Sequence, residues 1–406
     1  MDKIKNIKAF EILNAKGNPT VEVELTTEEG YVATASVPSG TSTGSYEAYV
    51  LNDGESRYGG KGVRKAVDNV NSIIAPALCG HNLDSQEEID NMMIQLDGTF
   101  NKARLGANSI LPVSVAFAKA RALSMREPLY ANLVKKDRYV LPDVIATMVS
   151  GGEFSPSGLD FEDYLYIFHS FPSFDKQMEA IVKLRKSLEK ELVGRYGAFP
   201  EDGGALAPPL SSTEEAFEVM LKVRDSLDLS DNVTLGLDVA ASELYESEEK
   251  KYRCKGLMDS KTLAGYYREL IDKYPLTYVE DGFDEDDIEG FRYFSQLLPP
   301  AIQNVGDDLF TSNIGRLEAY SSVANGLLLK INQIGSVSEA IKAANYAKEH
   351  GMDVTVSLRS GETCDNFIAD LSVAIGAKQI KLGSPVRAER NAKYNRLLRI
   401  AEELEG

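Results

Sequence analysis

The sequence predicts an α/β protein in which a parallel strand-helix barrel follows an N-terminal α+β domain. Three observations support this fold class. Near the N-terminus, apolar and polar residues alternate as they do in antiparallel strands. Helical periodicity then continues to about residue 130. Beyond it, short apolar runs that end in a charged residue alternate with amphipathic helices, which is typical of parallel barrels.

Length and composition indicate a soluble globular protein that is long enough for two domains. The chain has 406 residues, of which 43% are hydrophobic and 26% are charged. Its net charge of −18 argues against a nucleic-acid partner or an anionic membrane surface. An anionic substrate would therefore need local positive charge from lysine, arginine or a bound metal. We expect neither a signal segment nor a membrane span, because no apolar run is long enough.

The chain is poor in residues for thiol and imidazole chemistry. Its three cysteines lie far apart, so we expect no disulfide framework and a reducing, cytoplasmic location. Its three histidines are isolated, which argues against a histidine zinc site or a Ser-His-Asp triad. Any metal should therefore bind through oxygen ligands. These residues are Cys79, Cys254, Cys364, His81, His169 and His350.

The first 44 residues should contain strands and then a small-residue loop. Residues 5–38 are expected to form an antiparallel hairpin or meander, because the strand-like runs 21–25 and 31–37 flank a Glu-Gly turn. The following segment, 38–44, reads PSGTSTG. It can be a plain surface turn, or a lid whose hydroxyls and backbone amides close over an anion or a metal.

Two helices are predicted next. Ser85 and Glu88 have the spacing of a capping box ahead of an apolar periodic run, and another helix is expected over 107–125. We expect the N-terminal α+β domain to occupy residues 1–132 and the barrel domain to occupy residues 140–406.

Six apolar runs in the second part of the chain end in charged residues, and their spacing fits one strand-helix unit each. Helices are expected between them over 260–273, 336–350 and 365–375. Catalytic groups stand at the C-terminal ends of the strands in such barrels. The six ends are Asp238, Glu280 with Asp281, Asp307 with Asp308, Lys330, Arg359 with Ser360, and Lys381.

These strand ends predict a metal site that faces cationic side chains. Three carboxylates that converge on one face repel each other unless a cation lies among them. An oxygen-only ligand set favours a hard ion, Mg²⁺ before Mn²⁺ or Ca²⁺. The cationic half can bind an anion, since an arginine beside a serine suits a phosphate or a carboxylate.

Lys330 is the candidate general base, because it follows the buried run Leu327 to Leu329. Desolvation, a second lysine and a nearby divalent cation would all lower its pKa. In the alternative interpretation, its aliphatic stem packs against the strand while its ammonium group reaches water.

Sequence motifs along nearly the whole chain resemble those of enolases (phosphopyruvate hydratases). They include GNPTVEVEL (17–25), VPSGTSTGSYEA (37–48), VEDGFDEDD (279–287), LLLKINQIGSVSEA (327–340), RSGET (359–363) and IKLGSP (380–385). The resemblance implies a modified (β/α)8 TIM-type barrel with an N-terminal α+β cap, and two Mg²⁺ ions. It also implies reversible dehydration of 2-phosphoglycerate to phosphoenolpyruvate through a metal-stabilised enolate.

The resemblance also implies residue roles, carried over position by position. Lys330 would be the base that takes the α-proton, and Asp202 would stand at the position of the general acid. Substrate-binding residues would be Glu162, Asp163, Arg359, Ser360 and Lys381. The first metal would be held by Asp238, Glu280 and Asp307, and the second would be joined by Ser39.

Several positions depart from the enolase pattern. Asp202 replaces a glutamate, which withdraws the carboxyl group by one methylene, roughly 1.5 Å. Leu358 and Phe154 replace histidines, and Glu162 replaces a glutamine. Either these changes are neutral drift that is compensated elsewhere, or they alter recognition of phosphate and of the leaving group while the groups for proton abstraction are retained. At a position that the resemblance implies is a subunit contact, Lys16 replaces an arginine.

Three functions therefore stay open on the sequence. The first is an enolase acting on 2-phosphoglycerate. The second is a divergent paralogue that forms a metal-bound enolate from a related phospho, phosphono or hydroxy acid. The third is a degenerate barrel that serves as a binding protein, although the retained charges argue against it. In each case the resemblance implies a homodimer or a larger homo-oligomer.

Overall fold

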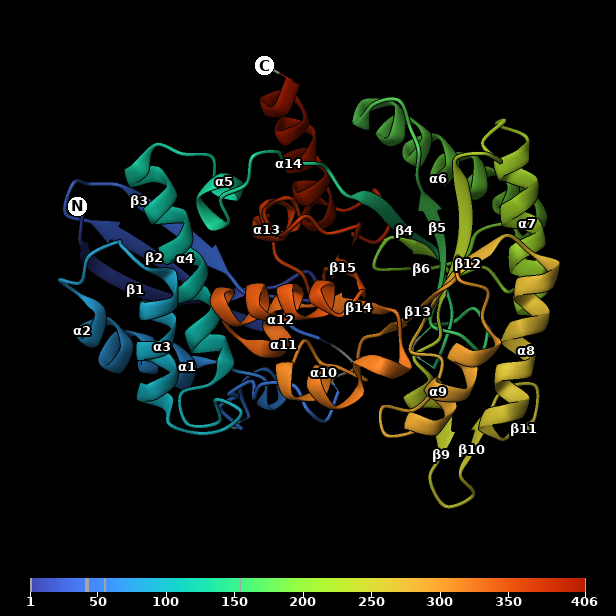
Figure 1. Cartoon of the computed structure of the whole chain (residues 1–406), viewed down its shortest axis with the longest axis horizontal. Helices are drawn as coiled ribbons and strands as arrows, with labels where there is room; N and C mark the ends of the chain where they lie inside the picture. The colour runs from blue at the N-terminus through green and yellow to red at the C-terminus, as the bar shows by residue number, and fades with distance from the viewer. Residues whose placement is uncertain (1, 41–43, 55, 154, 406) are drawn as a thin grey trace.

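The computed structural model describes residues 2–40, 44–54, 56–153 and 155–405. In Figure 1 the N-terminal sheet and the helices that pack on it lie together on the left, and the barrel lies to their right. The sheet has the order β1-β2-β3 and is antiparallel, as predicted. Its strands alternate buried and exposed residues, and the buried face packs on α4 (Ala107–Met125). The strands are β1 (Ile4–Leu13), β2 (Pro19–Thr27) and β3 (Val32–Ser36).

The helices of this N-terminal part follow from local signals. Ser85 precedes α3 (Gln86–Asp97), and its side chain accepts a hydrogen bond of 3.2 Å from the Glu88 amide, which confirms the predicted cap. The predicted helix over 107–125 is confirmed as α4. The other segments are η1 (Arg57–Gly60), α1 (Arg64–Asn69), η2 (Val70–Ile74), α2 (Ala75–Leu78) and α5 (Leu129–Leu133).

Eight strands then close into a barrel, because the last of them pairs with the first. The prediction of a barrel is confirmed, and all six predicted charged strand ends follow or end barrel strands. Two strands, β4 and β5, were not predicted. The strands are β4 (Asp143–Ser150), β5 (Asp163–Phe168), β8 (Val233–Asp238), β12 (Leu276–Glu280), β13 (Gln303–Gly306), β14 (Gly326–Leu329), β15 (Asp353–Ser357) and β16 (Gln379–Lys381).

The barrel is not wholly parallel, since β5 runs antiparallel to both β4 and β8. The start of β5 therefore lies at the same end of the barrel as the C-terminal ends of its neighbours. Asp163, its first residue, is paired with Ser150 on one side and with Asp238 on the other. The reversed strand thus adds a carboxylate to the end where catalytic groups gather.

Helices cover the outside of the barrel, and those expected over 260–273, 336–350 and 365–375 are confirmed as α8, α12 and α13 within two residues at each end. They are α6 (Phe174–Tyr196), α7 (Thr213–Asp225), α8 (Ser260–Lys273), α9 (Ile288–Leu297), α10 (Ile314–Tyr320), η4 (Ser321–Val323), α11 (Ile331–Ile334), α12 (Val337–Glu349), α13 (Phe367–Ile375) and α14 (Ala388–Glu405). The short segments β6 (Glu201–Asp202), β7 (Ala205–Leu206), η3 (Ala241–Leu244), β9 (Tyr245–Glu246), β10 (Lys251–Arg253) and β11 (Leu257–Met258) complete the fold.

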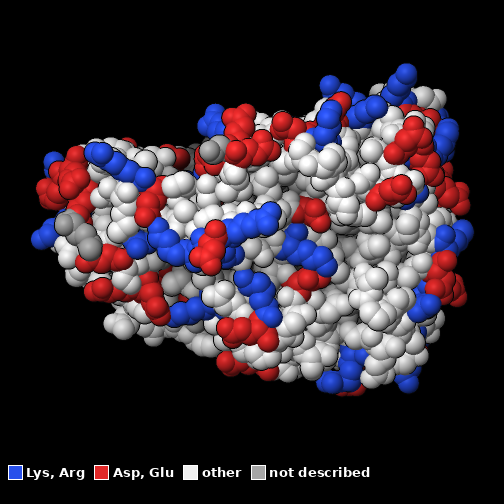
Figure 2. Space-filling model, turned by 45° about the horizontal axis from the view of Figure 1, so that its top comes forward, with Lys and Arg blue, Asp and Glu red and all other residues white. Residues whose placement is uncertain are grey.

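The barrel interior is filled by a small apolar cluster that includes Ile145, Tyr278 and Leu328. A larger core lies between the strands and the helices. Figure 2 shows acidic and basic side chains interspersed over one face of the molecule, with several Lys and Arg near its middle. Among the described residues, no helix combines the length and the apolar character that crossing a membrane requires.

Candidate active site

A row of carboxylates lies across the mouth of the barrel. Asp163, Asp238 and Glu280 occupy paired positions on the adjacent strands β5, β8 and β12. Asp307 follows directly after β13, the next strand. Parallel registration of the strands therefore brings together the three carboxylates that were predicted as metal ligands, and the reversed β5 adds Asp163 beside them.

Lys381, at the end of β16, reaches this row across the barrel. Its ammonium nitrogen lies 2.6 Å from Asp238 Oδ2 and 2.9 Å from both carboxylate oxygens of Glu280. The Tyr278 hydroxyl donates a further hydrogen bond of 2.8 Å to Glu280. Burial and the neighbouring Asp238 raise the pKa of Glu280 well above its ordinary value. The lysine thus neutralises carboxylates that would otherwise repel each other.

Lys330 follows directly after β14, and its ammonium group contacts the Asp307 carboxylate. The other Asp307 oxygen accepts a hydrogen bond of 2.7 Å from the Gln333 side chain. The expectation of a lowered lysine pKa is wrong for this structure. Burial by itself lowers the pKa of Lys330, but the nearby carboxylates of Asp307, Glu280 and Asp308 together outweigh burial and raise that pKa above its ordinary value. The ammonium group is mostly buried rather than extended into water, since the side chain is 15% exposed.

A second acidic group lies beside the predicted ligands. Asp281, Asp307 and Asp308 place one oxygen each within 4.8 Å of one another. Asp281 also accepts hydrogen bonds from the amides of Asp307 and Asp308, at 2.8 and 2.7 Å. The sequence marked Asp281 and Asp308 only as charged strand ends. The sequence signal that could have pointed to this acidic group is that two consecutive strands each end in two adjacent acidic residues.

Arg359, in the loop after β15, is held in a buried ion pair. Its guanidinium nitrogens donate to the two Glu47 carboxylate oxygens at 3.0 and 3.1 Å, and to the Asn332 side chain at 3.1 Å. Ser360 follows it in the same loop. Glu47 was not predicted as a site residue, because pairing between residues so distant in the chain leaves no local sequence signal.

The predicted acid and its neighbours lie on the β4–β7 side of the mouth. Asp202, in β6, accepts a hydrogen bond of 3.3 Å from Ser150 at the end of β4. Burial raises the pKa of Asp163 to about 6, and the Thr147 hydroxyl donates to this carboxyl group at 3.1 Å. Burial and Asp238 raise the pKa of Glu162 well above its ordinary value. Asp202, Asp163 and Glu162 therefore lie on the same side of the mouth, where the resemblance to enolases predicts that the substrate binds.

Three further positions were singled out in the sequence, namely Ser39, Leu358 and Phe154. The Ser39 hydroxyl accepts a hydrogen bond of 2.7 Å from Asn14, and its backbone pairs with Gly361 in the Arg359 loop. Leu358 packs partly buried against the apolar core. Phe154 lies outside the described residues, as do residues 41–43 of the predicted lid. The role of Ser39 as a ligand stays a prediction.

The donor set of the barrel mouth fits a hard divalent cation. The carboxylates of Asp238, Glu280 and Asp307 offer only oxygen, and no histidine is among the contacts described for them. Two ammonium groups lie against these carboxylates and supply positive charge there. A bound divalent cation would likewise neutralise the negative charge of these carboxylates.

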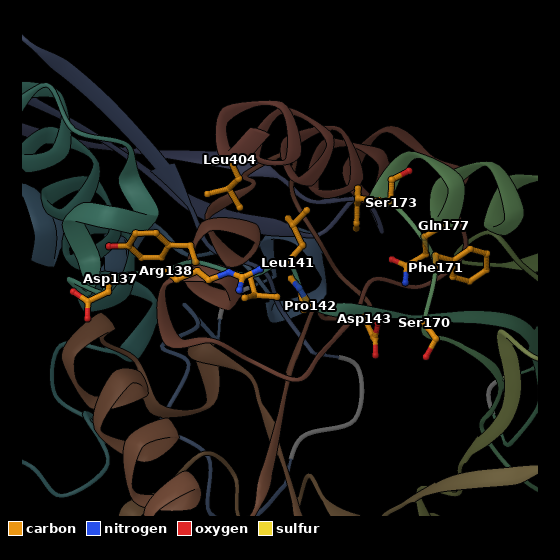
Figure 3. A pocket seen from close by; sticks show the side chains of 13 residues that line it. Asp137, Arg138, Leu141, Pro142, Asp143, Ser170, Phe171, Ser173, Gln177 and Leu404 are labelled. Atoms are coloured by element: carbon orange, nitrogen blue, oxygen red, sulfur yellow. The ribbon is translucent and has the colours of Figure 1, made fainter. Parts of the chain in front are cut away.

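A groove of about 620 Å³ lies at the opposite end of the barrel. Figure 3 shows its lining, which runs from Arg138 past Leu141 to Gln177. Asp143 belongs to it, and this residue begins β4, whereas Ser150 at the other end of β4 contacts Asp202. None of the predicted catalytic or metal-binding residues lines this groove.

Comparison with protein families identifies the chain. Residues 4–133 match the family model described as "Enolase, N-terminal domain", and residues 138–406 match that described as "Enolase, C-terminal TIM barrel domain". The chain belongs to the enolase family. The predicted fold class, a modified TIM-type barrel with an N-terminal cap, is thereby confirmed.

Curated enolases match this family member over its full length. A protein named enolase from Methanopyrus kandleri is 45% identical over 414 residues, covering 100% of this chain and 97% of the relative. Enolases from Methanococcus aeolicus and Pyrococcus furiosus are also 45% identical, over 407 and 412 residues. They cover 99% and 100% of this chain, and 95% and 96% of the relatives. The resemblance predicted from the motifs is confirmed.

Proposed function

We propose that this enolase-family protein is a Mg²⁺-dependent hydro-lyase that reversibly dehydrates 2-phosphoglycerate to phosphoenolpyruvate. The observation that carries the proposal is the pairing of two lysines, the buried Lys381 and the half-buried Lys330, with carboxylates from different strands. Lys381 contacts Asp238 and Glu280, and Lys330 contacts Asp307. In such an arrangement one lysine can take a proton from the substrate carbon beside its carboxylate group, while other positive charges surround that group of the substrate.

Lys330 takes the α-proton of the substrate in this proposal, and it must be neutral when it does so. Asp307 favours the charged lysine, whereas the Arg359 guanidinium lowers the pKa of Lys330 and so favours the neutral form. Asp202 donates the proton with which the hydroxyl group leaves as water. Its hydrogen bond from Ser150 orients the carboxyl group for this step.

The remaining predicted residues bind the substrate. Arg359 and Ser360 hold its phosphate group, and Lys381 lies at its carboxylate end, with Glu162 and Asp163 beside it. Asp238, Glu280 and Asp307 would hold the first Mg²⁺, and Ser39 would join the ligands of the second. When bound, Mg²⁺ supplies positive charge that stabilises the negative charge growing on the substrate carboxylate.

Our proposal extends to organisation and location. It divides the chain into domains at 1–132 and 140–406, near the two family matches. It also includes a homodimer or larger homo-oligomer and a cytoplasmic location, both taken from the resemblance to enolases.

A second candidate substrate is a related phospho, phosphono or hydroxy acid. The position of Leu358 favours it, because this side chain packs on the apolar core and offers no hydrogen-bond donor to a phosphate. Glu162 favours it too, since a half-buried carboxyl group stands there in place of an amide.

The experiment is to follow phosphoenolpyruvate formation from 2-phosphoglycerate by ultraviolet absorbance, with purified protein and excess Mg²⁺. We expect a metal-dependent rate that is lost in Lys330→Ala. Lys342→Ala is the matched control, because Lys342 lies on the surface of α12 and pairs with the exposed Glu87. No turnover by the wild-type protein, with Mg²⁺ binding still detectable, would reject 2-phosphoglycerate and direct the search to the second candidate.

A further inference from the structure

The loop that carries Arg359 and Ser360 is fastened on two sides. On one side, the backbone of Gly361 exchanges two hydrogen bonds of 2.9 Å with the backbone of Ser39. On the other side, the loop folds around the side chain of Glu362. This carboxylate is 3% exposed and belongs to the same turn of chain.

Glu362 connects the beginning and the end of the loop. Its Oε1 accepts a hydrogen bond of 3.1 Å from the Arg359 amide, and its Oε2 accepts one of 3.1 Å from the Thr363 amide. The carboxylate therefore fixes the backbone from which the Arg359 side chain extends. Because a buried carboxylate is costly without a counter-charge, this arrangement depends on a cation.

That cation is Lys393, from helix α14. Its ammonium group is 1% exposed and donates to Glu362 Oε2 at 2.6 Å, to the Thr363 carbonyl at 2.7 Å and to the Glu389 carbonyl at 2.8 Å. All three ammonium protons are thus used within the protein. α14 packs on α13 and α6, on the outside of the barrel (Figure 1).

We propose that Lys393 is a positioning residue for the anion-binding loop, acting on Arg359 and Ser360 through Glu362. The inference rests on the proposed function, in which these two residues hold the phosphate group of the substrate. Lys393 touches neither the substrate nor Lys330. Its loss should therefore weaken phosphate binding much more than it slows proton abstraction, since a small displacement of a binding group is costly.

The test uses Lys393→Met in the full-length protein loaded with Mg²⁺. We expect KM for 2-phosphoglycerate to rise about tenfold or more, with a much smaller fall in kcat. Glu362→Gln keeps the shape of the loop but removes the charge pair, and it should raise KM in the same direction. If Lys393→Met does not fold, Glu362→Gln decides.

Arg396→Met is the matched control. Arg396 lies three residues further along α14 and forms its own ion pair with the buried Asp370, at 2.6 Å, without contact to the Arg359 loop. We expect it to lower the melting temperature about as much as Lys393→Met while leaving KM unchanged. Equal losses of stability with an unchanged KM in all variants would overturn the proposal.

Calorimetric binding of inorganic phosphate to the Mg²⁺-loaded protein separates this proposal from the proposed function. Phosphate binding that is weakened by Lys393→Met supports the positioning role even if the wild-type protein shows no turnover. Turnover by the wild-type protein with unchanged KM and phosphate affinity in the variants would overturn the positioning role alone. A wild-type protein that neither binds phosphate nor turns over would overturn both.

Discussion

Glu47 and Arg359 form a buried ion pair that joins the N-terminal part of the chain to the barrel. The two side chains are 6% and 4% exposed, and two nitrogens of the guanidinium contact the two carboxylate oxygens. Glu47 also accepts a hydrogen bond of 3.2 Å from the amide of Gly44, the last residue of the predicted lid. The side chain of Arg359 is therefore fixed by a residue from outside the barrel.

Loss of this pair should destabilise the protein. Glu47→Ala leaves a buried guanidinium without its counter-charge, which costs about 3–5 kcal/mol of unfolding free energy. Urea unfolding followed by circular dichroism measures the shift in midpoint. Glu179→Ala is the control, because Glu179 and Lys176 form an exposed pair, and we expect little change there. Equal midpoints for Glu47→Ala and wild type would contradict this account.

Mg²⁺ should stabilise the folded protein through the carboxylates of the barrel mouth. A ligand that binds only the folded state at about 100 times its Kd adds about 2.7 kcal/mol. We expect the melting temperature to rise with Mg²⁺ but not with NaCl of equal ionic strength, and a chelator should reverse the rise. Asp307→Asn should reduce this rise strongly. If Mg²⁺ raised the melting temperature equally in that variant, Asp307 would not be a ligand.

Restoring the enolase pattern tests whether 2-phosphoglycerate is the substrate. The triple variant Leu358→His, Phe154→His, Asp202→Glu returns two donors and extends the acid by one methylene. A displacement of about 1 Å can cost about 10²-fold in rate, so we expect the rate of phosphoenolpyruvate formation to increase. Steady-state kinetics of each single variant would show which position matters. An unchanged or lower rate in the triple variant would mean that the pocket is built for another acid.

Stability should fall at acidic pH partly because of Glu11. Its side chain accepts a hydrogen bond from Arg57 at 2.5 Å, and this hydrogen bond holds the pKa of Glu11 below its ordinary value of 4.5. A carboxyl group with a lowered pKa in the folded state stabilises the protein above the unfolded value and loses this effect as the pH falls through the folded value.

We therefore expect Glu11→Gln to lower the melting temperature at neutral pH, with a difference from wild type that closes as the pH falls below 4.5. Melting curves over a pH series measure it. Glu28→Gln, at an exposed position, serves as the control. A constant difference at every pH would show that the charge of Glu11 is not involved.

Two barrel strands escaped prediction for an identifiable reason. The six predicted strands are apolar runs followed by a charged residue, and this local pattern can be recognised in the sequence alone. β5 instead begins with its charged residue, Asp163, because it runs antiparallel to its neighbours. A rule based on strands that end in charge could not find it, and β4, its hairpin partner, was missed with it.

The sequence by itself determined the fold class, the family and the chemical types at the strand ends, because strand patterns and motifs are encoded by neighbouring residues. Only the tertiary structure decided which charges meet. Lys381 pairs with Asp238 and Glu280 across the barrel, and Asp307 raises the pKa of Lys330, against expectation. Coulomb energy depends on distance and burial, and both are set by packing between residues far apart in the chain.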